Sequence, residues 1–502
     1  MWAFYWSSPY ILNQVADENM NESEIEPMDI SKIGLLEKAV QEDKITKDQF
    51  ISAFDLEKIQ EAFDYVSRKK TRGIDGTTLD NFIANKDCNF NIINQKCING
   101  TYRFAPYLQK LQTKGKGKAP RVISIATIRD RIVLHIIKVL LQKAFPECVN
   151  RKLPNNYVKE INDFFGKHGE DSSLCYYKTD IKGFYDTIPH NNLLDKVSAR
   201  ADFTSFLTLL EKSIKNPTVS YGSQRARKED HNKKGVPQGL SISNILADIY
   251  LRDFDITLTK MASNYYRFVD DIIIFNFGPE KACLRGNIQE QIKEIGLELN
   301  DTKTVCKSEN KVFEYLGYRF DLPKITIRSS SVDKFINSVA SMICSHKNNM
   351  QVEIKKHKWL DAEAYNKILI ETLNEKITGA VSENRKYGWL FYFLEINDEN
   401  LLHRMDRIIE SFFERLDEFG HQKPSNLKRL GRAYFEARYN LHSNYIHNYN
   451  KYVTLQDKLD YLNKLGKLNP DSKYTEEEIN GLFEKTKMQN LMHLENDIGE
   501  IS

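Results

Sequence analysis

The chain has 502 residues, of which 41% are hydrophobic and 28% charged, and its formal net charge is +3. This length allows about two to four domains with a sizeable core, and the composition excludes a disordered or fibrous chain. A net charge this small does not by itself indicate a nucleic-acid partner. Such a partner has to be inferred from local basic clusters.

The N-terminal stretch MWAFYWSSPYILNQV is apolar and aromatic. It lacks a basic start and is broken by Ser7, Ser8 and Pro9, so we expect no signal peptide. Two interpretations stay open, an arm packed on its own domain and a subunit contact, and the second would fit a homo-oligomer. No run of about 18 apolar residues occurs, so we expect neither a transmembrane helix nor a membrane partner. Scattered cysteines without a C-x-x-C pair favour a cytoplasmic location over a disulfide framework or a zinc site.

Four zones follow one another along the chain. Residues 16–30 are acidic and polar and are expected to form a linker, and residues 31–70 have helical periodicity. Residues 71–320 alternate short β-type runs with helices and hold most of the glycine-rich turns. Beyond about residue 325 the pattern predicts helices almost to the end.

Two segments of the third zone place carboxylates at the ends of predicted strands. In CYYKTDIKGFYDTI (175–188) a β-rich run leads to Asp180, and in YYRFVDDIIIF (265–275) Asp270 and Asp271 sit at the tip of an apolar hairpin. Taken alone, an Asp-Asp pair is also ordinary turn chemistry. If the three carboxylates converge, they need a cation to stay ionised together, and hard oxygen ligands select Mg²⁺. Two such ions clamp the attacking and leaving oxygens of a phosphoryl transfer.

Two neighbouring segments suit a nucleotide. In HNKKGVPQGLSISNILADIYL (231–251), small residues allow close approach of a base pair, and Gln238 is a neutral donor and acceptor. Upstream, Lys114, Lys116, Lys118 and Arg121 lie in or beside a glycine-rich loop where they can cradle a triphosphate. A solvated surface loop is the alternative for these charges.

The order of these segments resembles that of the bacterial reverse transcriptases related to group II intron proteins. RGIDGTTLDNF (72–82) resembles their entry motif, APRVISI their fingers segment, KTDIKGFYDTI motif A, GVPQGLSISN motif B and RFVDD motif C. GLELNDTKT (296–304) resembles motif D, and FEYLGYRF (313–320) resembles the primer grip. One departure is Phe268, which stands where many relatives have tyrosine.

The resemblance implies a role for each matching position. Asp180, Asp270 and Asp271, with the backbone carbonyl of Ile181, would hold two Mg²⁺ ions, for which Mn²⁺ can substitute, and Lys303 would act as general acid. Tyr185 would exclude the ribose 2′-hydroxyl and so favour dNTPs over rNTPs. Gln238, Arg121 and one of Lys114 or Lys118 would bind the incoming nucleotide, and Leu316 with Gly317 would hold the primer. A surface lysine is the alternative for Lys303.

The resemblance also implies the fold class, an α+β right-hand polymerase with helical fingers, an antiparallel-sheet palm and an α-helical thumb and extension. We expect an N-terminal arm and helical region over 1–70, fingers and palm over 71–320, a thumb over 321–415 and the extension over 416–502. The implied activity is RNA-directed DNA synthesis, with an RNA template or non-coding RNA and a DNA product as partners. Untemplated or protein-primed synthesis also occurs among such relatives.

The C-terminal region suggests which branch of these enzymes the chain is most like. It shows no His/Cys nuclease module, and NRKYGWLFYFLEINDENLLHRMDRII (384–409) loosely resembles the defence-associated, abortive-infection type. This implies a role against phage with an associated non-coding RNA. The alternatives are an intron-type maturase and a catalytically idle nucleic-acid-binding scaffold.

Basic and aromatic residues interleave in LKRLGRAYFEARYNLHSNYIHNYNKY (427–452). Such a pattern suits single-stranded nucleic acid, and one tyrosine hydroxyl is a candidate protein primer. The alternative is an amphipathic helix whose tyrosines pack on the thumb. The candidate residues are Arg432, Arg438, Tyr434, Tyr439, Tyr445 and Tyr449. A second basic patch, RARKEDHNKK (225–234), is placed to touch template or to form a surface loop.

Overall fold

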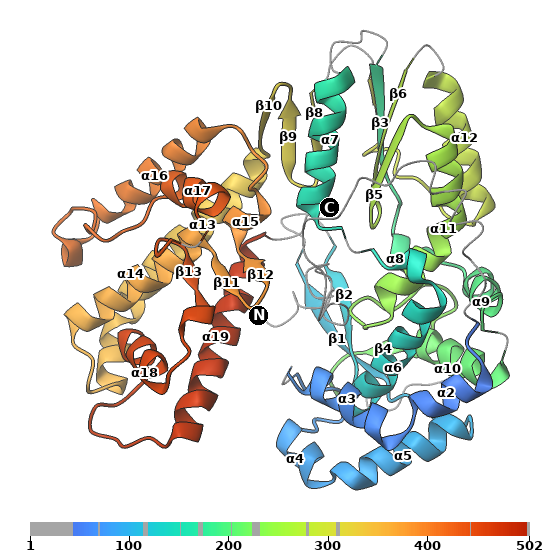
Figure 1. Cartoon of the computed structure of the whole chain (residues 1–502), viewed down its shortest axis with the longest axis horizontal. Helices are drawn as coiled ribbons and strands as arrows, with labels where there is room; N and C mark the ends of the chain where they lie inside the picture. The colour runs from blue at the N-terminus through green and yellow to red at the C-terminus, as the bar shows by residue number, and fades with distance from the viewer. Residues whose placement is uncertain are drawn as a thin grey trace. The chain divides into compact units, whose positions relative to one another are not determined.

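The computed structural model describes residues 44–68, 71–113, 119–150, 152–168, 174–201, 203–222, 231–277, 281–307, 312–441 and 443–498. Contacts divide the chain into two compact units, residues 1–153 with 172–308, and residues 154–171 with 309–502. Helices and strands occur in both units (Figure 1). The predicted α+β class is therefore confirmed. The N-terminal arm, the 16–30 linker and most of the 225–234 patch lie outside the described residues.

A four-stranded sheet organises the first unit. Its strand order is β5-β6-β3-β7, every neighbouring pair is antiparallel, and it is the sheet expected of a palm. Its strands are β5 (Asn264–Phe268), β6 (Asp271–Phe277), β3 (Leu174–Asp180) and β7 (Val305–Lys307). Ile272 and Ile274 of β6 share a core with α9 (His190–Ser198), α11 (Ser243–Met261) and α12 (Lys281–Glu294). Five successive residues of β6 are buried, because both faces of this strand are covered.

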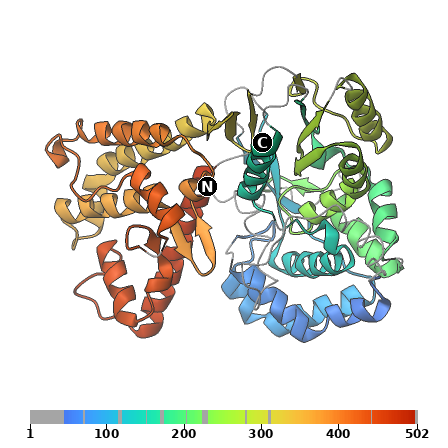
Figure 2. The ribbon, with the colours of Figure 1, turned by 45° about the horizontal axis from the view of Figure 1, so that its top comes forward.

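Helices and a small sheet make up the rest of the first unit. The sheet has the order β2-β1-β4, with β1 at Tyr107–Gln112, β2 at Arg121–Ile125 and β4 at Thr218–Val219. The helices are α2 (Lys47–Ala53), α3 (Leu56–Ser67), α4 (Leu79–Ala84), α5 (Lys86–Ile98), α6 (Ile128–Ala144), η4 (Pro146–Cys148), α8 (Phe184–Thr187) and α10 (Thr204–Lys215). The blue helices α2 to α5 lie together at one end of this unit (Figure 2).

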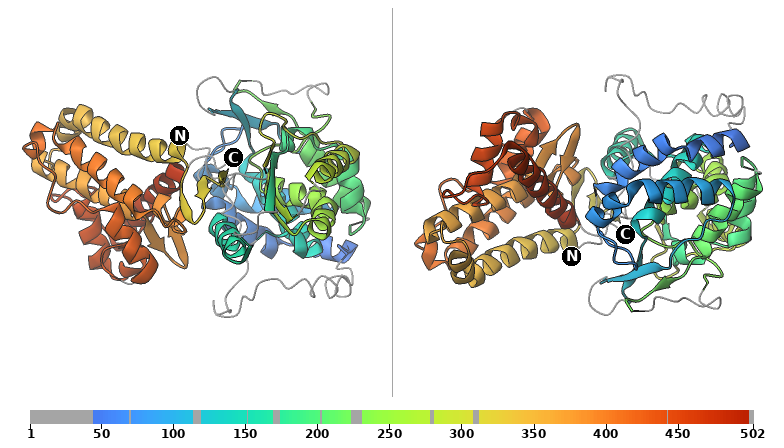
Figure 3. Two further views of the ribbon diagram at one scale, coloured as in Figure 1. Left: turned by 90° about the horizontal axis from the view of Figure 1, so that it is seen from above. Right: turned by 90° about the horizontal axis from the view of Figure 1, so that it is seen from below.

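The second unit joins one early helix to the C-terminal part of the chain. Its helices are α7 (Pro154–His168), α13 (Ser329–Lys356), α14 (Ala362–Thr378), α15 (Trp389–Tyr392), α16 (Glu399–Phe413), η6 (Asp417–Phe419), α17 (Leu430–Tyr439), η7 (Tyr449–Lys451), α18 (Leu455–Lys464) and α19 (Glu476–Ile498). The long α13 is seen along its length in Figure 3. Strands β8 (Val312–Tyr315), β9 (Tyr318–Asp321) and β10 (Lys324–Ile327) form an antiparallel meander.

The expectation of helices almost to the end is only partly met. A small sheet of β11 (Ala380–Ser382), β12 (Arg385–Tyr387) and β13 (His447–Asn448) interrupts the helices. Among its described residues, the stretch 427–452 has only one α-helix, α17, which ends at Tyr439, and one short 3-10 turn, η7. The Asn440 side chain donates to Glu436 Oε2 at 2.9 Å. The backbone of Asn440 leaves the helical region, with φ −147° and ψ 52°, which the periodicity of the stretch did not reveal.

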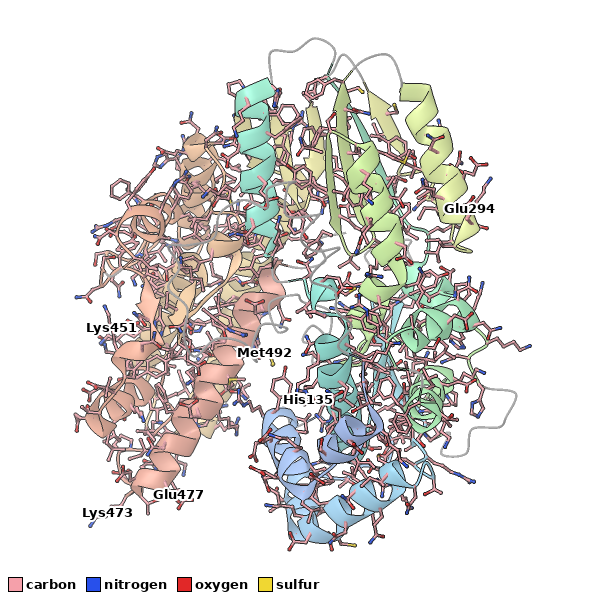
Figure 4. The ribbon with its side chains drawn as sticks, turned by 45° about the vertical axis from the view of Figure 1, so that its right-hand side comes forward. His135, Glu294, Lys451, Lys473, Glu477 and Met492 are labelled. Atoms are coloured by element: carbon pink, nitrogen blue, oxygen red, sulfur yellow. The ribbon has the colours of Figure 1, made fainter. Side chains whose placement is uncertain are left out.

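Charged side chains mark the outer surfaces of both units. In Figure 4, Glu294 at the end of α12 points away from the sheet, and Lys473 and Glu477 mark the start of α19. Within the described ranges, every helix is too short or too polar to cross a lipid bilayer.

Candidate active site

The three predicted metal-binding aspartates meet at one end of the palm sheet. Strand β3 ends at Asp180, and its register pairs Asp180 with Asp271, the first residue of β6. Directly opposed residues of an antiparallel pair have Cβ atoms about 5 Å apart. The backbone N–H of Ile181 donates to the carbonyl of Asp270 at 3.1 Å, which joins the third aspartate to the same edge.

The turn that presents Asp270 has an unusual backbone. Strands β5 and β6 are connected by only Val269 and Asp270, so the tight turn expected at Asp270 and Asp271 lies one residue earlier, and Asp271 is the first residue of β6. Val269 has a φ of 58°, in the left-handed region. A β-branched residue there is a clear outlier, and such conformations persist only when surrounding contacts enforce them.

The aspartates lie among positive groups. Asp180 Oδ1 accepts from Lys303 Nζ at 3.1 Å, and its Oδ2 accepts from Asn300 Nδ2 at 3.3 Å. Lys178 Nζ lies 3.7 Å from Asp271 Oδ1. Lys178 sits two residues before Asp180, so strand alternation puts both on one face.

Burial raises the pKa of two of these carboxyl groups. For Asp271 the pKa rises to about 7, with Lys178 opposing the rise and Asp270 and Asp180 adding to it. For Asp270 burial raises the pKa to about 6, the Asp180 carboxylate adds to this, and Lys303 and Arg121 oppose it. Crowded, desolvated carboxylates of this kind favour binding of a proton or a cation.

The donor set fits a hard divalent cation in chemistry and in backbone position. Carboxylate oxygens are the ligands that Mg²⁺ prefers, and all three carboxylates are brought to one sheet edge. The Asp180 side chain, however, bonds Lys303 and Asn300, and the Asp271 side chain faces Lys178. In the part of the chain that the structure describes, no three His, Cys, Asp or Glu residues form a ready-made metal-binding group. Metal binding by Asp180, Asp270, Asp271 and the Ile181 carbonyl therefore stays a prediction.

The predicted nucleotide-binding residues lie on segments that are bonded to each other. In α8, Tyr185 is half-buried, and its hydroxyl donates to Asn244 Oδ1 of α11 at 2.9 Å. The Tyr185 carbonyl accepts from Val236 N at 2.7 Å, which ties the GVPQG segment to α8. Gln238 Nε2 donates to Asp186 Oδ1 at 3.0 Å, and the Gln238 carbonyl accepts from Ser124 of β2 at 2.7 Å.

Gly235 allows the GVPQG segment to lie this close to α8. Its φ is +87°, and a Cβ atom added there would lie 2.8 Å from the carbonyl oxygen of Asp186. Its N–H donates to the Ile188 carbonyl at 2.7 Å. A side chain at this position would separate the two segments.

Other predicted residues lie elsewhere. Lys114 and Lys118 are outside the described residues. Leu316 and Gly317 form the β8–β9 turn in the second unit, where both have positive φ and the buried Leu316 carbonyl accepts from the Tyr392 hydroxyl at 3.0 Å. The contact of Leu316 and Gly317 with a primer stays a prediction.

The candidate tyrosines of 427–452 differ in accessibility. Tyr434 and Tyr449 are buried, and their hydroxyls donate to the Ile396 carbonyl and to Glu375 Oε1, the latter at 2.6 Å. Tyr445 stacks under Arg432, whose guanidinium lies 4.6 Å from the ring centroid. Tyr439 is 67% exposed. Burial of Tyr434 and Tyr449 agrees with the packing alternative for those two residues.

Sequence reasoning missed several contacts of the site. Asn300 and Lys178 bond or face the aspartates, Asn244 holds Tyr185, and Arg267 holds the hairpin turn. Strand alternation signals Lys178. The contacts of Asn300 and Asn244 join elements far apart in the chain and leave no local pattern, and Arg267 bonds a residue only two positions away.

Comparison with known proteins identifies the region that contains this site. Residues 113–320 match the family model described as "Reverse transcriptase (RNA-dependent DNA polymerase)". The chain is 25% identical over 297 residues to Protein YkfC of Escherichia coli K12, a match covering 50% of this chain and 75% of that protein. It is 23% identical over 314 residues to the group II intron-encoded protein LtrA of Lactococcus lactis, covering 57% of this chain but only 49% of LtrA.

Among solved structures, telomerase from Candida albicans in complex with a fragment of telomeric RNA has a TM-score of 0.39. The sequence identity is 14%, and the match covers 64% of each chain.

We predict that Gly235→Ala destabilises the GVPQG segment. Clash with Asp186 adds to the cost of a positive φ, so the free energy of unfolding in urea should fall by about 3 kcal/mol, and exchange of the Val236 amide should accelerate. Gly222→Ala is the matched control, because Gly222 has a φ of +97° but no described heavy atom within 4 Å of an added Cβ. It should cost only about 1 kcal/mol. Equal losses in both variants would contradict the close approach.

Proposed function

We propose that this chain, whose residues 113–320 match the reverse transcriptase family model, is an RNA-directed DNA polymerase that adds dNTPs to a growing DNA end. The observation that carries the proposal is the cross-strand pairing of Asp180 with Asp271, with Asp270 bonded alongside. Tyr185 and Gln238 lie on segments that are hydrogen-bonded into the same unit.

The aspartates are proposed to hold Mg²⁺, with Mn²⁺ as a substitute. Asp180, Asp270, Asp271 and the Ile181 carbonyl would be the ligands from the protein. When bound, two such ions stabilise the charge that develops on the attacking and leaving oxygens. Lys303 lies 3.1 Å from Asp180 Oδ1, and we assign to it protonation of the departing pyrophosphate.

Selection of deoxyribonucleotides is proposed to rest on the Tyr185 ring. The hydrogen bond to Asn244 fixes the hydroxyl end of that ring against α11. A ring held in one position excludes the ribose 2′-hydroxyl, whereas a freely rotating side chain would not. Arg121, whose charge acts on both Asp270 and Tyr185, is proposed to bind the triphosphate together with Lys114 or Lys118.

We expect Asp270→Asn and Asp271→Asn each to reduce primer extension on an RNA template by about 10³-fold or more, because each removes a ligand charge. The folded state should not be weakened, since removing one of several crowded carboxylate charges relieves repulsion. Asp195→Asn is the control, because Asp195 is exposed on α9, and it should keep full activity. Substantial synthesis by either site variant would refute the assignment.

Replacing Tyr185 by alanine should admit ribonucleotides. The ratio of kcat/KM for dATP to that for ATP should fall by about tenfold or more, because the steric wall is removed. Tyr185→Phe keeps the ring but loses the hydrogen bond to Asn244, so its discrimination should lie between that of the unaltered protein and that of the alanine variant. If the alanine variant leaves the ratio unchanged, Tyr185 does not select the sugar. If the unaltered protein prefers rNTPs, an RNA polymerase becomes the better interpretation.

For the biological role we propose antiphage defence with an associated non-coding RNA, in the cytoplasm. This rests on the helical C-terminal region and on the loose resemblance of residues 384–409 to the defence-associated type. An intron-type maturase is the second candidate, favoured by the similarity to LtrA. Sequencing the RNA and DNA that co-purify with the protein from its host separates the two. Recovery of its own intron RNA would replace defence by the maturase role.

We propose that one face of α17 contacts single-stranded nucleic acid. Phe435 and Tyr439 are 58% and 67% exposed, and their ring centroids are 5.1 Å apart. Arg438 lies beside them, with its guanidinium 5.8 Å from the Tyr439 centroid. Exposed rings next to a cation offer stacking to bases and charge to phosphates.

Loss of the two exposed rings should weaken this contact. Phe435→Ala combined with Tyr439→Ala is expected to reduce affinity for a single-stranded DNA oligonucleotide by about tenfold or more. Ile408→Ala, which removes an exposed apolar side chain from α16, should leave the affinity unchanged. If a tyrosine hydroxyl here primes synthesis, Tyr439→Phe should abolish a nuclease-resistant nucleotide–peptide adduct, whereas Tyr434→Phe should retain it. The absence of an adduct on the unaltered protein would reject priming but not binding.

A further inference from the structure

A buried guanidinium lies directly behind the aspartate turn. Arg267 of β5 donates from Nε and Nη2 to the two carboxylate oxygens of Asp255 at 2.8 and 2.5 Å. Its Nη1 donates both to Asp248 Oδ1 at 3.1 Å and to the backbone carbonyl of Val269 at 3.0 Å. The Arg267 side chain is only 10% exposed. The fork of an arginine can hold one carboxylate at two points and still direct a further donor elsewhere, which a lysine cannot do.

The contact with Val269 falls on the strained residue of the hairpin. A left-handed conformation costs a β-branched residue about 1–3 kcal/mol, so it needs contacts that enforce it. On one side the Val269 carbonyl is held by Arg267, and on the other the Asp270 carbonyl is held by the N–H of Ile181 at 3.1 Å. The turn that presents Asp270 and Asp271 is therefore fixed from two directions.

Helix α11 connects Arg267 to Tyr185, the residue proposed to select deoxyribonucleotides. Asp248 and Asp255, which bind Arg267, and Asn244, which accepts from Tyr185, are all on α11. Positions four and eleven residues after Asn244 lie on nearly the same face of an α-helix, because eleven residues make about three turns. One face of one helix thus positions both the ring at the sugar and the turn carrying the carboxylates.

From this geometry we propose that Arg267 is a positioning residue of the polymerase site. It acts through the Val269 carbonyl to hold Asp270 and Asp271 at a set distance from Tyr185. Helix α11 supplies hydrogen-bond partners to both Arg267 and Tyr185. The proposal rests on the polymerase function proposed above. The competing explanation is that the Arg267 cluster is an ordinary buried ion pair that contributes only to stability, as breaking such pairs is usually destabilising.

The test compares Arg267→Lys and Asp248→Asn with the unaltered full-length protein. Arg267→Lys keeps the charge but loses the fork, and Asp248→Asn keeps the shape but weakens the hold on Nη1. Because small displacements of reacting groups cost about 10²-fold in rate, we expect kcat to fall by about 10- to 100-fold in Arg267→Lys and less in Asp248→Asn. KM for dNTP should change by less than about threefold, because the nucleotide-binding residues are untouched.

A second readout does not depend on catalysis. Binding of Mn²⁺ to the protein without substrates, followed by electron paramagnetic resonance, should weaken several-fold in both variants and should be lost in Asp270→Asn. The control is Asp253→Asn on the same helix, where the exposed Asp253 pairs with Lys196. It should leave kcat and Mn²⁺ affinity at their original values. Thermal unfolding of each variant shows what fraction is folded at the assay temperature.

The outcomes separate the two explanations. Lower melting temperatures with unchanged kcat and unchanged Mn²⁺ affinity for the folded protein would overturn the positioning role. If Arg267→Lys does not fold, the same two measurements on Asp248→Asn decide the matter. If the unaltered protein binds Mn²⁺ but makes no DNA, the polymerase proposal fails, while the effect of the variants on Mn²⁺ binding still tests whether Arg267 positions the carboxylates.

Discussion

The pairing of β3 with β6 is the constraint on which the site depends. In that register Asp180 faces Asp271, and the Asp270 carbonyl falls opposite the N–H of Ile181. Because side chains alternate along a strand, a slip of one residue would turn Asp271 to the other side of the sheet. The two-residue turn between β5 and β6 opposes such a slip, because the turn of a hairpin fixes its register. The turn and the β3–β6 ladder together thus determine where the charges lie.

The negative charges of the aspartates oppose folding at the edge of the sheet where they meet. Carboxylates that are buried and close together disfavour their ionised forms, as the raised pKa values of Asp270 and Asp271 indicate. Lys178, Lys303 and Arg267 surround the edge and partly balance it, the first two by facing carboxylates and the third by bonding the turn. A strained turn and a crowded acidic edge are kept in place by a core that is stable elsewhere, as is usual where a protein binds a charged ligand.

Parts of the fold and site could be foreseen because their signals are local. A hairpin with a tight turn at Asp270 and Asp271 was predicted from two apolar runs, and the structure has a two-residue turn at Val269 and Asp270, one residue earlier. The extent of helix in 427–452 was not foreseen. The spacing of the tyrosines there fits a helix, but α17 ends at Tyr439. Tyr449 is buried, and its hydroxyl donates to Glu375 of α14. A contact between residues so far apart in sequence leaves no periodic signal.

The sequence by itself determined which chemical groups this protein carries, in which order, and that Asp180 and the Asp270–Asp271 pair lie next to apolar strand-forming runs. Short-range rules suffice for that, because strand alternation and turn chemistry act between near neighbours. Only the tertiary structure decided that Lys303 and Asn300 bond Asp180, that Asn244 holds Tyr185, and that Arg267 holds Val269. Each of these contacts depends on a side-chain direction and on the packing of separate elements, which the identity of the residues alone does not specify.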